Sequence, residues 1–351
     1  MPHWYLGLFH RSYLLPLVRS ISKELGSQSD PPFHIAHING EPEEEWKRHL
    51  SFHKVNAPYS FMRSKMARFF LSRKKLYHQI KNVDVHVIFT LSECWAQEFS
   101  RYCSGKMGVP YVVWLRGSHR EVRKTKKVNI LKERVLNYFE TKSLKKADMV
   151  IPNSKGLAKK AEEWGVEKEK IAPPVYNAVD TCMFRPMTVE RSEEFTIAYF
   201  GRISPEKGIL RLLKIADKLK DVHFVIAGKK QMNVSFPSSI EYLGELSYSE
   251  MPSFYNKVDL IILPSITEGF PGVILEAYAC QKPVLATKEA FPEELKVFGS
   301  VCDIDEFESE ISRLKKSDLR ALAQRARSYV KKYYTWEKFG RSIVQLLRET
   351  L

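Results

Sequence analysis

Short apolar runs alternate with amphipathic stretches along most of the chain. Such runs occur at residues 4–9, 33–38, 83–90, 109–115, 148–152, 195–200, 222–227, 240–244 and 258–264. Between the runs, apolar residues often recur at helical spacing, as they do at Leu14, Leu17, Val18, Ile21 and Leu25. A continuous apolar run is typical of a strand buried on both faces, and its alternation with helices indicates βαβ units. The pattern therefore predicts an α/β fold with parallel sheets.

The alternation restarts once. A proline-rich connection lies at residues 173–180, and a new order of strand, turn and helix begins after residue 190. We therefore expect two doubly wound, Rossmann-like domains, one formed by residues 1–185 and one by residues 186–332. Two such domains facing each other would leave a cleft between them.

One turn in the second half has the features of a phosphate site. Residues 265–278 follow the apolar run at 258–264 and lead into a helical segment. Pro271 suits the first helical position because its missing N–H is one that a helix leaves unpaired. Gly269 and Gly272 allow the backbone to approach a ligand closely. The unpaired N–H groups of this helix would then face the space beyond the strand's carboxyl end, where phosphates bind.

Two glutamates bracket this turn. Glu268 lies within it, and Glu276 follows about two turns later, at the rim of the expected site. A glutamate near a helix start often only caps the helix or carries a solvated charge. Neither position needs an acid for the fold, so we interpret the pair as ligand-binding residues.

The composition of the chain excludes several classes of protein. The chain has 351 residues, 44% of them hydrophobic, which is enough for two cores. No apolar run reaches the roughly 18 residues of a membrane span, and residues 4–9 are too short for a signal peptide. These features predict a soluble, cytoplasmic protein. The five cysteines contain no CxxC pair, which argues against a zinc site or a disulfide framework.

Positive charge is concentrated in the first half. Residues 1–180 contain 31 Lys and Arg against 18 Asp and Glu, and the rest of the chain contains 25 against 23. A net charge of +13 in this half indicates an anionic partner, which could be nucleic acid, an anionic membrane or a phosphate-bearing acceptor. Alternatively, the charges only form a solvated surface. Residues 59–81 interleave basic and apolar side chains, which is compatible with a helix at a membrane surface or with a core-facing helix.

The first half also offers polar residues at expected strand ends. Arg116 and His119 follow the run at 109–115, and ligands of open α/β sheets bind at such ends. His10 lies in a loop without glycine, which therefore forms no P-loop. It is either an acceptor-side residue or a polar loop tip.

An ordered set of motifs connects these features to a family. The set comprises residues 177–180 (Asn-Ala-Val-Asp), 184–186 (Phe-Arg-Pro), Gly201-Arg202, Lys207-Gly208, Gly228, Gly244, Glu268-Gly269-Phe270, Glu276-Ala277 and 283–287 (Pro-Val-Leu-Ala-Thr). It resembles the retaining nucleotide-sugar glycosyltransferases of family four, which have the GT-B fold. The resemblance extends over about residues 109–336.

The resemblance implies roles for individual residues. Arg202 and Lys207 would hold the donor diphosphate, Glu268 the hydroxyls of the transferred sugar, and Glu276 the ribose. The last helix, at residues 333–351, would return to complete the first domain. The residues expected around the donor are Gly201, Arg202, Lys207, Gly228, Phe270, Pro271, Gly272, Val273 and Glu276.

The chemistry of sugar transfer agrees with these roles. Breaking a sugar–phosphate bond builds negative charge on the diphosphate, and two cations with a helix N-terminus stabilise it. We therefore expect neither a metal nor another cofactor, and no DxD pair follows an expected strand. A glycosidase would need two carboxylates as acid and nucleophile, whereas both glutamates are assigned to hydroxyl groups here. The resemblance implies retention by front-face attack, with the departing phosphate helping to deprotonate the acceptor.

The chain departs from the family on the acceptor side. Family members commonly have a glycine-rich turn where this chain has residues 9–13, which contain no glycine. They often have a histidine at the position of Arg116 and an aspartate at the position of His119. We expect a hexosyltransferase that acts on a saccharide or lipid-linked acceptor, peripheral at the inner face of the cell membrane. Its expected catalytic residues are Glu268, Arg202, Lys207, Arg116 and His119.

Two other functions agree with part of the sequence. The departures from the family leave open a non-catalytic nucleotide-sugar-binding or scaffold protein of the same fold. Nucleic-acid binding would explain the charge but not the glutamates, and no nucleic-acid motif is visible. We therefore expect no nucleic-acid partner.

Overall fold

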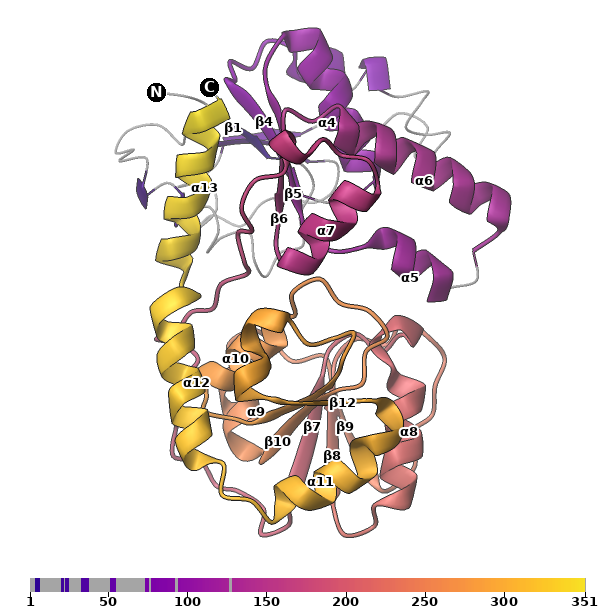
Figure 1. The fold of residues 1–351 in the computed structure, drawn as a ribbon, viewed down its shortest axis with the longest axis vertical. Helices are drawn as coiled ribbons and strands as arrows, with labels where there is room; N and C mark the ends of the chain where they lie inside the picture. The colour runs from indigo at the N-terminus through magenta and orange to yellow at the C-terminus, as the bar shows by residue number, and fades with distance from the viewer. Residues whose placement is uncertain are drawn as a thin grey trace. The chain divides into compact units, whose positions relative to one another are not determined.

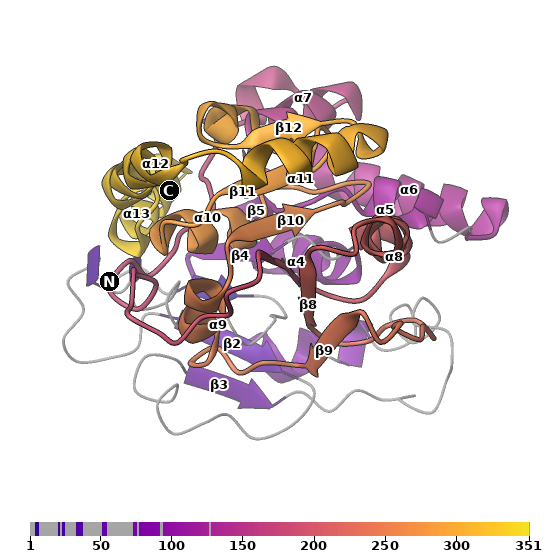
Figure 2. The same ribbon diagram turned by 90° about the horizontal axis from the view of Figure 1, so that it is seen from below.

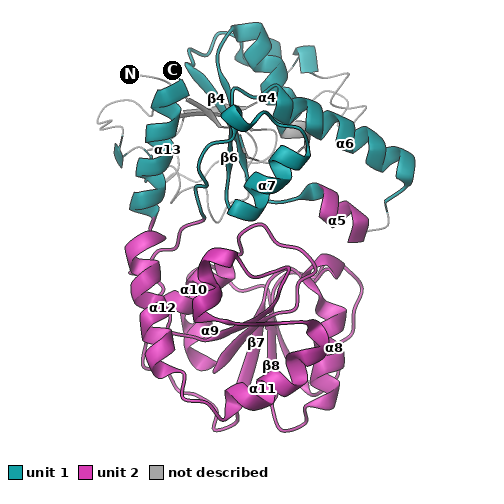
Figure 3. Cartoon of the chain, in the orientation of Figure 1, with its two compact units in different colours: residues 1–119, 128–176, 336–351 teal, residues 120–127, 177–335 magenta. Residues whose placement is uncertain are grey.

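The chain forms two compact units in the computed structural model (Figure 3), which describes residues 4–6, 20–21, 23–24, 33–37, 51–54, 73–75, 77–91, 94–125 and 128–350. Unit 1 comprises Met1–His119, Val128–Tyr176 and Trp336–Leu351, and unit 2 comprises Arg120–Lys127 and Asn177–Thr335. The chain thus leaves unit 1 and returns to it with its last helix.

Unit 1 is built on a parallel sheet of six strands in the order β3-β2-β1-β4-β5-β6. The strands are β1 (Trp4–Leu6), β2 (Phe33–His37), β3 (Ser51–Lys54), β4 (Val87–Leu91), β5 (Tyr111–Leu115) and β6 (Met149–Pro152). Its helices include α4 (Cys94–Met107), α6 (Ile130–Lys145), α7 (Lys155–Glu163), the 3-10 turn η1 (Lys168–Lys170) and α13 (Trp336–Thr350).

Alternate residues of β5 serve the two faces of this sheet. Val113 belongs to the core that also contains Leu144 of α6 and Leu157 of α7. Trp114 points to the opposite face, where its ring lies 4.9 Å from that of Phe339 in α13. The C-terminal helix therefore covers part of the unit 1 sheet.

Unit 2 repeats the same winding. Its six parallel strands have the order β12-β11-β10-β7-β8-β9. The strands are β7 (Thr196–Phe200), β8 (His223–Ala227), β9 (Ile240–Gly244), β10 (Leu260–Leu263), β11 (Val284–Thr287) and β12 (Ser300–Cys302). The helices and 3-10 turns are α5 (His119–Thr125, which begins in unit 1), η2 (Pro205–Lys207), α8 (Ile209–Lys218), α9 (Met251–Lys257), α10 (Gly272–Ala279), η3 (Glu293–Phe298), η4 (Ile304–Glu306), α11 (Phe307–Lys315) and α12 (Arg320–Tyr333).

Helices cover both faces of the unit 2 sheet (Figures 1 and 2). Helices α8 and α11 pack on one face through a core that includes Leu212, Ile262 and Ile311. Helices α9, α10 and α12 gather on the other face. All four residues of β10 are buried, as expected for a parallel strand between two helical layers. The predicted α/β class with two doubly wound parallel sheets is confirmed.

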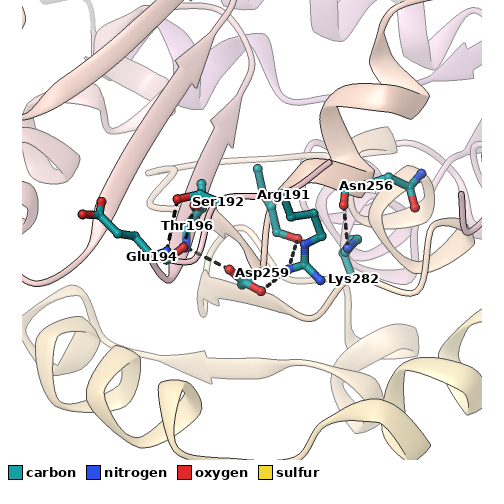
Figure 4. A network of polar contacts seen from close by, with 8 residues as sticks. Arg191, Ser192, Glu194, Thr196, Asn256, Asp259 and Lys282 are labelled. Carbon is teal, nitrogen blue, oxygen red and sulfur yellow. Dashed lines mark hydrogen bonds and ion pairs between the residues drawn. The ribbon is translucent and has the colours of Figure 1, made fainter. Parts of the chain in front are cut away.

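A polar network holds the chain where it enters unit 2 (Figure 4). Asp259 accepts the backbone N–H of Thr196 at 2.9 Å and forms an ion pair with Arg191. The buried amide of Asn256 accepts the N–H of Met187 at 2.9 Å. These contacts bind the incoming segment at the amino ends of β7 and β10. The carboxyl ends of these strands stay available for ligands.

Three strands are not among the predicted runs, and two predicted features lie largely outside the described residues. Strands β3 and β12 are short edge strands, and β11 has four residues. The loop at residues 9–13, with His10, is not described, and of residues 59–81 only 73–75 and 77–81 are. Within the described part of the chain, no helix is long and apolar enough to cross a membrane.

Candidate functional site

The candidate site lies where the winding of the unit 2 sheet reverses. Strands β7 and β10 are neighbours, although β8 and β9 lie between them in the sequence. The chain therefore turns to opposite sides of the sheet from these two strands, and the loops after them lie at the carboxyl edge of the sheet, where ligands of such sheets bind. Arg202 and Lys207 follow β7, and Glu268 follows β10.

Lys207 and Glu268 meet at this edge of the sheet. The Nζ atom of Lys207 lies 2.6 Å from Oε1 of Glu268, and the Ser265 hydroxyl donates to the same oxygen at 2.9 Å. The side chains of Lys207 and Glu268 are 20% and 10% exposed. A carboxylate with two donors is oriented strongly, because charge-assisted hydrogen bonds are short and directional.

A close backbone contact brings the two loops together. Gly208 has a φ of 73°, and a Cβ atom there would lie 1.9 Å from the carbonyl oxygen of Pro264. Only glycine fits this left-handed position against the loop after β10. The N–H of Ile266 donates to the carbonyl of Glu206 at 2.9 Å, which joins the same two loops again. The sequence around Gly208 therefore places Lys207 beside Glu268.

Arg202 lies next to this pair of loops. Its guanidinium is 3.5 Å from the buried carboxylate of Glu206, and its backbone carbonyl accepts the Tyr199 hydroxyl at 2.7 Å. Burial raises the pKa of Tyr199, so this phenol stays a neutral donor. About half of the Arg202 side chain remains exposed, which leaves it accessible to an anion.

Gly201 and Gly228 also form a tight backbone contact. A Cβ atom on Gly228, whose φ is 143°, would lie 1.9 Å from the carbonyl oxygen of Gly201. The ends of β7 and β8 can therefore approach closely beside Arg202. Both glycines were predicted near the donor, and the structure places them together at the carboxyl edge of the sheet.

Helix α10 begins at the same edge. Pro271 is its N-cap residue and Gly272 its first helical residue, one position later than the sequence predicted. In the described structure no side chain caps this end; the N–H of Ile274 donates to the carbonyl of Pro271 at 3.2 Å, and the N–H groups of Gly272 and Val273 have no partner within the helix. The preceding residue, Phe270, stacks on Tyr334 at 5.6 Å, and its carbonyl accepts the Asn177 amide at 2.5 Å.

Glu276 does not lie at a rim. It is only 3% exposed, and its Oε2 accepts the Tyr255 hydroxyl at 2.7 Å. Burial raises its pKa to about 7, although the hydrogen bond from Tyr255 acts in the opposite direction. The expectation was wrong because Glu276 comes little more than one turn after the helix start, on the side that faces α9.

Arg116 and His119 belong to unit 1. Arg116 follows β5, its guanidinium lies 5.0 Å from the centre of the Trp114 ring, and its carbonyl accepts the Asn153 amide at 3.1 Å. His119 is the first residue of α5 and is partly buried. The structure thus groups the other predicted residues in unit 2 and places these two at the end of a unit 1 strand.

Ser265 and Tyr255 are site residues that sequence reasoning missed. Ser265 is the first residue of the predicted stretch at 265–278, but no role was assigned to its hydroxyl. Tyr255 lies 21 residues from its partner, Glu276, and no local pattern indicates the contact. Among the described residues, no group of three His, Cys, Asp or Glu side chains could hold a metal ion.

Together, the fold and the site define an α/β protein with a cluster of cations and carboxylates at the switch point of its second sheet. Solved structures with this fold include sucrose-phosphate synthase from Thermosynechococcus elongatus (TM-score 0.81, 16% identity, 99% of both chains covered). Another is Anabaena HepE in complex with UDP-glucose (TM-score 0.77, 17% identity, 99% and 100% covered). At this level of identity the likeness establishes the GT-B fold.

Sequence comparison identifies the family. The model of Glycosyltransferase Family 4 matches residues 17–182, and the model of Glycosyl transferases group 1 matches residues 194–317. These matches together span most of the chain, and the chain belongs to this glycosyltransferase family. The family assignment made from the sequence motifs is confirmed.

Curated relatives are similar over part of their length. An uncharacterized glycosyltransferase of Methanocaldococcus jannaschii is 30% identical over 204 residues, which are 55% of this chain and 53% of the relative. The lipopolysaccharide 1,2-N-acetylglucosaminetransferase of Salmonella typhimurium is 28% identical over 187 residues, 45% and 49% of the two chains. The chain thus spans about half the length of the curated relatives it matches.

Proposed function

We propose that this protein is a hexosyltransferase that moves a sugar from a nucleotide diphosphate sugar to an acceptor, with retention at the anomeric carbon. The observation that carries the proposal is the cluster of Lys207, Glu268 and Arg202 beside the uncapped start of α10. Two cations and free N–H groups suit a diphosphate, and an oriented carboxylate suits sugar hydroxyls.

The proposed reaction places charge stabilisation in unit 2. The bond between the anomeric carbon and the donor phosphate breaks, and its electrons go to the leaving diphosphate. Lys207, Arg202 and the first N–H groups of α10 stabilise that charge where it develops. Glu268, held by Ser265, accepts hydrogen bonds from the sugar. The acceptor oxygen bonds to the same face of the carbon, and its proton goes to the departing phosphate.

The acceptor is proposed to be a saccharide or a lipid-linked molecule at the inner face of the cell membrane. Support comes from the +13 charge of residues 1–180 and from the lipopolysaccharide named for the Salmonella relative. Arg116 and His119 are the proposed acceptor-side catalytic residues. A guanidinium is suited to a phosphate or to sugar hydroxyls.

Turnover of the donor tests the proposal directly. Incubation with UDP-, GDP- and ADP-sugars is expected to give slow hydrolysis of one of them. Glu268→Gln should reduce that hydrolysis by at least about a hundredfold while the circular dichroism spectrum stays unchanged. Near-full activity of a folded Glu268→Gln protein would show that the site assignment is wrong.

Membrane association has its own test. Sedimentation with anionic liposomes should decrease as salt is added and when Arg73, Lys74 and Lys75 are replaced by Ala. Helix residues Lys74 and Lys75 are exposed in the structure. Salt-independent or absent binding would point to an acceptor that is not at a membrane.

A second candidate is a nucleotide-sugar-binding or scaffold protein without catalysis. Arg116 and His119 favour it, because they stand where the family commonly has a histidine and an aspartate. Saturable binding of a nucleotide sugar without turnover on any acceptor would support this candidate.

A further inference from the structure

Tyr255 lies outside the family motifs, but it is directly bound to one of them. Its side chain is 0% exposed, and its hydroxyl donates to Oε2 of Glu276 at 2.7 Å. Its ring packs against the rings of Phe184 and Phe200, whose centres lie 5.9 and 6.3 Å away. Packing thus fixes the phenol of α9 in place, and the hydroxyl can in turn fix the carboxylate of α10.

The other carboxylate oxygen of Glu276, Oε1, is not held by a hydrogen bond in the described structure. Oε1 keeps a small solvent-accessible area although the residue as a whole is only 3% exposed, so a ligand can reach this oxygen while Tyr255 holds Oε2. The arrangement therefore favours a ligand that brings a hydroxyl donor to Oε1.

Among the described residues, charged and titratable groups near Glu276 lie on or beside α9, α10 and α12. Tyr248, which precedes α9, and Cys280, which directly follows α10, both have raised pKa values, chiefly through burial and in part through the charge of Glu276. From α12, Arg327 donates to the carbonyl of Ala279, at the end of α10. Of the groups that act on Glu276 within the described structure, Tyr255 is the one that favours the charged form.

We propose that Tyr255 is a positioning residue that holds Glu276 as a carboxylate with Oε1 turned to the ribose hydroxyls of the donor nucleotide. This inference rests on the proposed function, since it assumes that the site binds a nucleotide sugar. Tyr255 does not touch the ligand in this scheme. It sets the orientation and the charge of the group that does.

The proposal has a consequence for pH dependence. The carboxylate accepts a hydroxyl more strongly than the neutral acid does, so recognition of the ribose should improve as pH rises through about 7. Removing the Tyr255 hydroxyl takes away the group that lowers the pKa of Glu276. In Tyr255→Phe, the improvement should therefore occur at higher pH, by about one unit.

The test compares two nucleotides at several pH values. A thermal-shift screen first identifies which nucleoside diphosphate binds. The dissociation constants of that nucleotide and its 2′,3′-dideoxy form are then measured between about pH 5.5 and pH 9. The wild type should prefer the ribose form by about tenfold at high pH and less at low pH. In Tyr255→Phe, the preference should decrease near neutral pH and return only at higher pH.

Tyr278 provides a matched control on the same helix. It is also buried, and its hydroxyl has no hydrogen-bond partner within the described structure. Tyr278→Phe removes the same atom from the same layer, so it should leave the ribose preference and its pH profile unchanged. Glu276→Gln should make the preference independent of pH, because it removes the titrating group.

The possible outcomes are distinct. If a folded Tyr255→Phe protein has the same profile as the wild type and Tyr278→Phe, the positioning role is wrong. If Glu276→Gln retains a pH-dependent preference, Glu276 is not the group that reads the ribose, and the inference is likewise overturned. If no nucleoside diphosphate binds the wild type, the proposed function itself fails, and the inference fails with it.

Discussion

The two units share one topology and differ in what their strand ends carry. Each has six parallel strands, with the first strand of its half between the second and the fourth. In unit 2, the strand ends carry a cation–carboxylate cluster in which Lys207, Glu268 and Ser265 are connected. In unit 1, Arg116 lies over Trp114 at the end of β5. The same scaffold thus supports different chemistry, because the loops rather than the sheets carry the functional groups.

The two halves of the chain also differ in net charge. The first 180 residues have an excess of 13 positive charges, whereas the rest of the chain is nearly balanced. In unit 2, several cations have specific partners, such as Lys207 with Glu268 and Arg191 with Asp259. Paired charges suit a site of defined geometry, and a net excess of one sign suits long-range attraction to an anionic surface or acceptor.

The largest expected effect separates the two units directly. Lys207→Ala should reduce both donor hydrolysis and sugar transfer by about a hundred- to a thousandfold, because it removes a cation from the leaving group. Arg116→Ala should reduce transfer to the acceptor but leave donor hydrolysis within about twofold. Both rates can be measured by release of the nucleoside diphosphate with and without acceptor. Equal loss of hydrolysis in the two variants would contradict a division of donor and acceptor roles.

Replacing one glycine in each unit by alanine compares how closely the backbone is packed at these two positions. Gly208→Ala in unit 2 should lower the free energy of unfolding by about 3 kcal/mol, because its φ is left-handed and the new Cβ would meet the Pro264 carbonyl. Among the described residues, no atom outside its own helix backbone lies within 4 Å of a Cβ position built on Gly105 in α4 of unit 1. Gly105→Ala should raise stability by up to about 1 kcal/mol. Urea unfolding of both variants measures the difference, and a neutral Gly208→Ala would show that the loops can separate.

Loss of the Ser265 hydroxyl, which holds the Glu268 carboxylate, is expected to have a smaller effect on activity. Ser265→Ala removes one of the two donors to Oε1 and should lower kcat/KM for the donor by about tenfold. Ser328→Ala, at an exposed position of α12, is the matched control and should be neutral. An unchanged kcat/KM in Ser265→Ala would mean that Lys207 alone orients the carboxylate.

Much of this protein was predictable because its signals are local. Continuous apolar runs such as β10 predict buried parallel strands, and the order of Arg202, Lys207, Glu268 and Glu276 predicts the family. Side-chain environment was less predictable. Glu276 was expected at a rim and is buried, because the side of a helix that packs inward depends on the neighbouring helix. Tyr255 was missed for the same reason.

The sequence by itself determined the two rounds of alternating strands and helices, since that pattern depends on residues a few positions apart. The tertiary structure alone decided which side chains meet. Lys207 and Glu268 are 61 residues apart, and they form a pair only because β10 lies beside β7 in the sheet. Strand order depends on the packing of the whole unit, and this packing turns separate polar residues into one site.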